Sequence, residues 1–144
     1  MLKIHTILHP TDFSPRSEHA FQLACTLARD HGARLLVLHV IDQPIAAYGG
    51  VMTAPPAPPP VEERKSAQEQ MRRMCASEPK LLIEYRLQDG DPARWILQIA
   101  TDCKCDLIVM GTHGRTGLRR LLMGSVAEQV LRNAACPVLT LKAE

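Results

Sequence analysis

Residues 34–41, RLLVLHVI, form an almost continuous apolar run in the first third of the chain. A strand with one face in water alternates apolar and polar residues, whereas this run is apolar on both faces. Strands buried on both faces are typical of parallel sheets, because the helices that connect parallel strands cover both sides of the sheet. The run therefore predicts a buried strand of a parallel sheet.

Strand-like and helix-like segments alternate along the rest of the chain. Ser14 and Asp91 are each followed by proline, and a capping residue before proline at the first helical position marks the start of a helix. Gly32 suits the left-handed residue that ends the first of these helices. The alternation predicts the α/β class: an open, mostly parallel five-stranded sheet with helices on both faces. The expected strands are 3–9, 34–41, 81–87, 106–110 and 137–142, and further helices are expected at about 61–76 and 125–133.

The length of 144 residues fits one domain, which we expect to span 1–144. Segment 42–60, DQPIAAYGGVMTAPPAPPP, departs from the alternation, because its proline and glycine content excludes a helix or a central strand. Long loops in compact domains are usually functional lids or disordered. We interpret 42–60 as a Pro-rich variable loop.

Composition narrows the class of function. A net charge of +2 and an aromatic content of 3% give no support for binding nucleic acid, which needs a basic surface or stacking platforms. There is no secretory leader pattern and no apolar run of spanning length, so we expect a cytoplasmic protein with no membrane partner. The five cysteines have no framework spacing and are interpreted as free thiols. No quartet of cysteine and histidine suggests a zinc site.

Three glycines and a serine follow the expected strand 106–110. Gly111, Gly114, Gly124 and Ser125 are spaced G-x2-G-x9-G-S, and no Asp or Glu occurs between Leu107 and Ala127. Glycines let backbone N–H groups approach a ligand, and a helix beginning at Ser125 favours an anion at its N-terminus. These features fit a phosphate site built from main-chain donors. The alternative is that the glycines only shape a turn and Ser125 only caps a helix.

A carboxylate follows the first expected strand, at the same edge of the sheet. In HPTDFS, residues 9–14, Asp12 lies just past the strand end. Such a carboxylate can accept hydrogen bonds from a ribose or an exocyclic amine. The alternative is that Asp12 is a helix-cap residue.

Together these segments resemble the universal stress protein family. The resemblance rests on ILHPTDFS, on LLVLHVID and on the almost uninterrupted match of GTHGRTGLRRLLMGSVAEQVLRNAACPVLTLK. The nucleotide-binding signature of the family, G-x2-G-x9-G-[S/T], is complete here. The resemblance implies a fold like the flavodoxin-like and adenine nucleotide alpha-hydrolase-like sandwiches, with strand order 3-2-1-4-5. It also implies binding of ATP with Mg²⁺ or Mn²⁺, in a dimeric regulatory protein of the stress response.

The same resemblance assigns roles to individual positions. Adenine and ribose would meet Pro10, Thr11, Asp12 and the backbone of Val40. The ribose and α-phosphate would meet Met110, Gly111 and Gly114, and the outer phosphates Gly124, Ser125 and Val126, with His113 and Arg115 within reach of phosphate. The metal ion would be held through the phosphates, with no protein ligand assigned.

Relatives often pair their last strand across a two-fold axis, which implies a homodimer through 137–142, PVLTLK. A protein partner of unknown identity would read the bound state. Two alternatives stay open. One is a slow ATPase, for which only Asp12 or His113 could position water; the other is a dimeric interaction protein that does not use nucleotide. No catalytic residue is assigned, and enzymatic activity is left undecided.

Overall fold

The computed structural model describes residues 2–42, 57–112 and 124–142. Its five strands form one sheet in the order β3-β2-β1-β4-β5, and every neighbouring pair is parallel. This confirms the predicted class and strand order. The strands are β1 (Thr6–Pro10), β2 (Arg34–Asp42), β3 (Ile83–Gly90), β4 (Leu107–Gly111) and β5 (Val138–Leu141).

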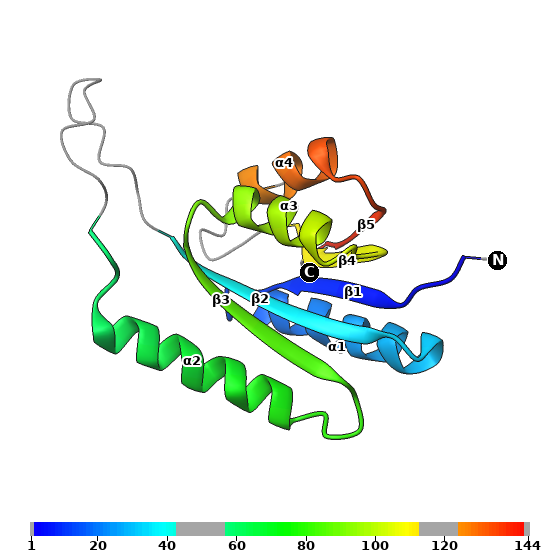
Figure 1. The fold of residues 1–144 in the computed structure, drawn as a ribbon, viewed down its shortest axis with the longest axis horizontal. Helices are drawn as coiled ribbons and strands as arrows, with labels where there is room; N and C mark the ends of the chain where they lie inside the picture. The colour runs from blue at the N-terminus through cyan, green and yellow to red at the C-terminus, as the bar shows by residue number, and fades with distance from the viewer. Residues whose placement is uncertain (1, 43–56, 113–123, 143–144) are drawn as a thin grey trace.

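Four helices connect the strands and cover both faces of the sheet. Helices α1 and α2 lie on one face, and α3 and α4 lie on the other (Figure 1). The helices are α1 (Pro15–His31), α2 (Val61–Ala76), α3 (Pro92–Asp102) and α4 (Ser125–Asn133).

The capping residues predicted from the sequence are confirmed. Ser14 is the N-cap of α1 and its Oγ accepts a hydrogen bond from the backbone N–H of Ser17 at 3.2 Å. Asp91 caps α3 in the same way, accepting from the N–H of Arg94 at 3.0 Å. Gly32 ends α1 with φ 64°, the left-handed conformation that a residue without Cβ adopts without strain.

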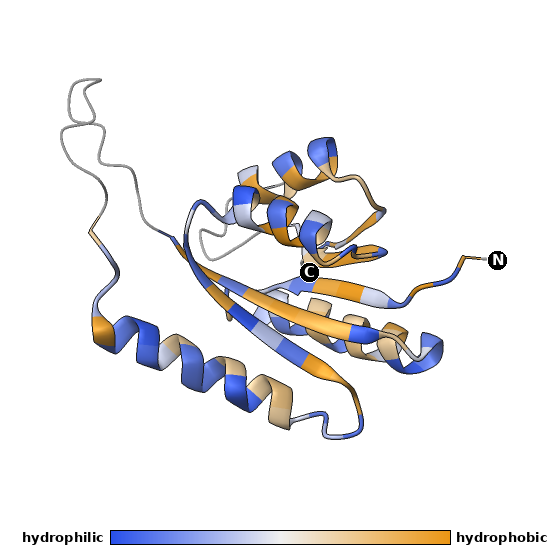
Figure 2. Ribbon diagram, in the orientation of Figure 1, coloured by the Kyte–Doolittle hydropathy of each residue, from blue (hydrophilic) through white to orange (hydrophobic). Residues whose placement is uncertain are grey.

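The sheet separates two hydrophobic cores. Successive residues of β2 point to opposite faces, so Leu35 and Val37 pack towards α1, whereas Leu36 and Leu38 pack towards α3 and α4. All four are buried, which explains why the run 34–41 is almost continuously apolar. Figure 2 shows the apolar colouring concentrated along β1, β2 and β4, the three inner strands.

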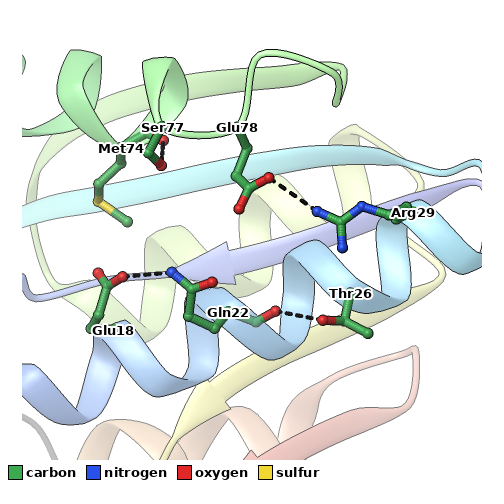
Figure 3. Close-up of polar contacts among 7 residues, drawn as sticks. All are labelled: Glu18, Gln22, Thr26, Arg29, Met74, Ser77 and Glu78. Carbon is green, nitrogen blue, oxygen red and sulfur yellow. Dashed lines mark hydrogen bonds and ion pairs between the residues drawn. The ribbon is translucent and has the colours of Figure 1, made fainter.

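Helix α2 is a surface helix at the edge of the sheet. Of its residues, only Ala67 and Met71 are buried, and its outer face is polar (Figure 2). Arg64 of α2 bonds Asp89 of β3 at 2.7 Å. Past the end of α2, Glu78 bonds Arg29 of α1 at 3.0 Å (Figure 3). Exposed ion pairs of this kind add little stability.

Strand boundaries differ from the predicted ones. Strand pairing begins at Thr6 rather than at residue 3, and the N–H groups of His5 and Thr6 both donate to the carboxylate of Asp106. Strand β3 begins and ends later than predicted. It extends to Gly90 because its polar end, Gln88–Gly90, pairs with β2 up to Asp42. Within the Pro-rich segment, Asp42 ends β2, residues 57–60 have no regular structure, and 43–56 lie outside the described residues.

Candidate functional site

A cleft of about 420 Å³ opens at the carboxyl ends of β1, β2 and β4. Between β1 and β4 the order of the strands reverses, and open parallel sheets bind ligands at such a switch point. The volume lies within the range of small-molecule sites. Nine of the twelve predicted site residues line this cleft: Pro10, Thr11, Asp12, Val40, Met110, Gly111, Gly124, Ser125 and Val126. The other three, His113, Gly114 and Arg115, lie outside the described residues.

One end of the cleft is formed by the start of α4. Gly124 is the N-cap residue, and among the residues that the structure describes no side chain accepts a hydrogen bond from the amides of the first turn. Its own N–H donates to the carbonyl of Thr112 at 2.7 Å, and the N–H of Thr112 donates to the carbonyl of Leu141 at 3.0 Å. These bonds fix the helix start beside the end of β4. The first-turn amides and the helix dipole make this end of the cleft favourable for an anion.

A tightly bonded turn after β1 forms another part of the wall. The N–H of Thr11 donates to the carbonyl of Leu38 at 2.8 Å, and the hydroxyl of Ser17 donates to Thr11 Oγ1 at 2.7 Å. Asp12 Oδ1 accepts the N–H of Ser14 at 2.9 Å. Ser14, and not Asp12, is therefore the cap of α1. The alternative interpretation of Asp12 as the helix cap is wrong.

Sequence reasoning missed part of the lining. The cleft also contains Ser17, Leu38, His39, Ile41, Asp42, Glu63, Pro92, Ile96, Thr112 and Ala127. Three of these come from α2 and α3, whose approach to the cleft depends on tertiary packing. A signal existed for His39, which directly precedes Val40. The Nδ1 atom of His39 lies 2.8 Å from the carbonyl oxygen of Thr11.

The charges of the cleft are unevenly placed. Its described lining includes three carboxylates, Asp12, Asp42 and Glu63, and neither lysine nor arginine. In this part of the chain the start of α4 is thus the main source of positive potential. The arrangement suits a ligand with an anionic tail and a body that carries hydrogen-bond donors.

His9 lies outside the lining of the cleft. It is fully buried on the α1 side of the sheet, where its ring centroid lies 5.7 Å from that of Phe21. Its Nδ1–H donates to the carbonyl of Val109 at 2.9 Å, and Nε2 has no partner in the ranges the structure describes. Burial lowers the pKa of His9 to about 4, so the ring is neutral at pH 7.

The thiols and possible metal ligands are placed as follows. Cys25 and Cys105 are buried, and burial raises the pKa of both thiols to about 12, which disfavours the nucleophilic thiolate. Across residues 2–42, 57–112 and 124–142, the histidine, cysteine and acidic side chains form no group arranged to hold a metal ion. Within the same ranges, no helix combines the length and apolarity needed to cross a membrane.

Comparison with known proteins gives one consistent result. A model of the universal stress protein family matches residues 3–142. The chain is 38% identical over 139 residues to universal stress protein MJ0531 of Methanocaldococcus jannaschii, covering 94% of this chain and 81% of the relative.

Solved structures match over nearly the whole chain. UspA from Lactobacillus plantarum superposes with a TM-score of 0.79 at 26% identity, covering 96% of this chain and 98% of the other. A universal stress protein from Archaeoglobus fulgidus, solved in complex with dAMP, superposes with a TM-score of 0.68 at 22% identity, covering 97% and 98%. At that identity the second likeness establishes a shared fold.

Proposed function

The chain belongs to the universal stress protein family, and from this premise we propose that it is a regulatory module of the stress response that binds ATP with Mg²⁺ or Mn²⁺. The nucleotide would occupy the cleft at the carboxyl ends of β1, β2 and β4. Binding, rather than rapid hydrolysis, would be its main activity. The dAMP complex of the Archaeoglobus fulgidus relative, which has the same fold, is consistent with a nucleotide as the ligand.

One observation carries the proposal. Residues far apart in the sequence line a single cleft, in which no described side chain accepts a hydrogen bond from the first-turn amides of α4. A ligand in the cleft can supply acceptors for these amides. A phosphate group supplies several acceptor oxygens and the charge that the helix dipole favours.

The chemistry of the lining suggests how the ligand would be oriented. Gly124, Ser125 and Val126 would hold the outer phosphates, and Met110 with Gly111 the ribose and α-phosphate. Asp12, at the turn after β1, would accept hydrogen bonds from the ribose or the base. The described lining offers carboxylates but no cation, and a divalent ion would therefore reduce repulsion by neutralising the triphosphate.

The regulatory effect would come from a difference in affinity between two states of the protein. A ligand shifts an equilibrium only as far as its affinities for the two states differ. We propose that the two states differ at the end of β2 and the start of α2. Asp42 and Glu63 line the cleft at these two places, and the rest of the Pro-rich segment lies between them in the sequence. A protein partner would recognise one of these states.

We also propose a homodimer through β5. The strand lies at the edge of the sheet, its Leu139 is 38% exposed, and Val138 and Leu141 are only partly buried. An apolar edge strand is an aggregation hazard unless it is covered. Pairing with a second copy across a two-fold axis would cover it.

Two substitutions at Gly124 test the phosphate end of the site. Gly124 has φ −59° and ψ 152°, which other residues also adopt, so Gly124→Asp and Gly124→Asn should fold without backbone strain. Both are good helix N-caps and differ mainly in charge. Calorimetric titration with ATP and MgCl₂ should show Gly124→Asp binding at least about tenfold more weakly than Gly124→Asn, because a carboxylate there repels phosphate.

Adenosine, which has no phosphate, is the control ligand. Its affinity should be nearly the same in the two variants, and thermal unfolding should show both to be at least as stable as the parent protein. Equal ATP affinity in the Asp and Asn variants would mean that the phosphates do not approach the start of α4.

A further inference from the structure

The side chain of His39 contacts the residues on both sides of Asp12. Its Nδ1 atom lies 2.8 Å from the carbonyl oxygen of Thr11, and because a carbonyl only accepts, Nδ1 must donate. The ring centroid of His39 lies 4.2 Å from that of Phe13, with the ring planes inclined at 35°. His39 belongs to β2 and lines the same cleft as Asp12. A side chain from the neighbouring strand thus holds both flanks of the acidic residue.

The backbone at Phe13 requires support of this kind. Phe13 has φ 63°, a left-handed conformation that bulky side chains rarely adopt. Such conformations persist where the surroundings impose them, and they cluster at functional sites. The N–H of Phe13 donates to Thr11 Oγ1 at 3.1 Å, and the N–H of Ser14 donates to Asp12 Oδ1 at 2.9 Å. The turn therefore fixes one oxygen of the Asp12 carboxylate.

Two other bonds attach the turn to the fold at Thr11. Its N–H bonds the backbone of Leu38, and its Oγ1 accepts from the hydroxyl of Ser17. Both act on the residue before Asp12. The ring of His39 acts also on the residue after it, where the backbone is left-handed. Of these bonds, only the one from His39 reaches the carbonyl of the peptide that joins Thr11 to Asp12, and Phe13 also packs against the core on the α1 side of the sheet. Removing the donor of His39 would therefore release the peptide that leads into Asp12.

We propose that His39 is a positioning residue that holds Asp12 in the orientation that receives the base and ribose of the ligand. This inference rests on the nucleotide-binding function proposed above and adds a residue to its site. His39 acts through Asp12, which the proposed function assigns to the ribose and base rather than to the phosphates. Loss of the His39 side chain should therefore weaken the binding of adenosine and the binding of ATP by the same factor.

Two variants separate the donor of His39 from its ring. His39→Phe keeps an aromatic ring and loses the Nδ1–H, whereas His39→Asn keeps an amide donor near the position of Nδ1. In calorimetric titrations, His39→Phe should lower the affinities for adenosine and for ATP with MgCl₂ by about tenfold each, the effect of one lost hydrogen bond. His39→Asn should bind both within about threefold of the parent protein. His31→Phe, at the exposed end of α1, is the matched control and should bind like the parent.

Several results would overturn the proposal: unchanged affinity in His39→Phe, a loss confined to ATP, or a loss in His39→Asn as large as that in His39→Phe. A second measurement needs no ligand. Amide hydrogen exchange at Phe13 and Ser14 should be faster in His39→Phe than in His39→Asn, and equal rates would contradict the positioning role. If the parent protein binds neither ligand, the proposed function fails, and the exchange rates alone decide whether His39 holds the turn.

Discussion

At the scale of single residues, His9 is an ionisable group buried without a charged partner in contact. Its ring is fully buried and donates one hydrogen bond, to the backbone of Val109. Desolvation lowers the pKa of His9 from 6.5 to about 4, although the carboxylate of Asp12 acts in the opposite direction. The unfolded chain therefore binds a proton over a pH range in which the folded chain does not.

This difference predicts how stability depends on pH. Above pH 6.5, His9 is neutral in both states and has no effect. Between pH 6.5 and about 4, the free energy of unfolding should fall by up to about 1.4 kcal/mol per pH unit, because only the unfolded state is protonated. Urea denaturation at several pH values measures this slope. The slope should be shallower in His9→Asn, which does not titrate, and unchanged in the control His19→Asn.

A slope in His9→Asn as steep as that of the parent protein would contradict the assignment of this pH dependence to His9. The comparison uses slopes rather than absolute stabilities. A constant loss of stability from the smaller asparagine therefore does not affect it.

At the scale of elements, the free edge of β5 can be tested without disturbing the sheet. The N–H of Ile108 bonds the carbonyl of Pro137, and that of Thr112 bonds the carbonyl of Leu141. Alternate residues of a parallel strand bond the same neighbour, so the N–H of Thr140 points away from β4. Proline at that position removes a donor from the free edge and none from the ladder.

Thr140→Pro should therefore break the proposed homodimer and leave the monomer folded. Light scattering at micromolar concentration should give twice the chain mass of 16.0 kDa for the parent protein and for the control Thr140→Val, and 16.0 kDa for Thr140→Pro. A dimer that persists in Thr140→Pro would mean that the interface does not involve the free edge of β5. A monomeric parent protein would contradict the proposed homodimer.

Element boundaries were predictable where side chains fix them locally. The starts of α1 and α3 follow from Ser14-Pro15 and Asp91-Pro92, because cap and proline act within one turn. The end of α3 has no such signal. There the left-handed residue is Lys104, with φ 51°, where a glycine would be expected. The extension of β3 to Gly90 depends on pairing with β2, which a polar sequence does not reveal.

At the scale of the molecule, the candidate site was predictable where it follows the order of the strands. Thr11 and Gly111 lie at the ends of β1 and β4, and the topology of a parallel sheet brings such ends together. The contributions of Glu63 and Ile96 were not predictable, because they depend on how α2 and α3 pack on the sheet. The left-handed turn at Phe13, which gives His39 its contact, has no glycine to signal it.

The central claim is that main-chain amides at the start of α4 hold a polyphosphate. A crystal structure of the protein grown with ATP and MgCl₂ tests it most directly. The account predicts phosphate oxygens within about 3 Å of the backbone nitrogens of Ser125 and Val126, with the base beside Asp12 and Val40. A cleft that stays empty at saturating ATP, or a triphosphate bound away from α4, would contradict it.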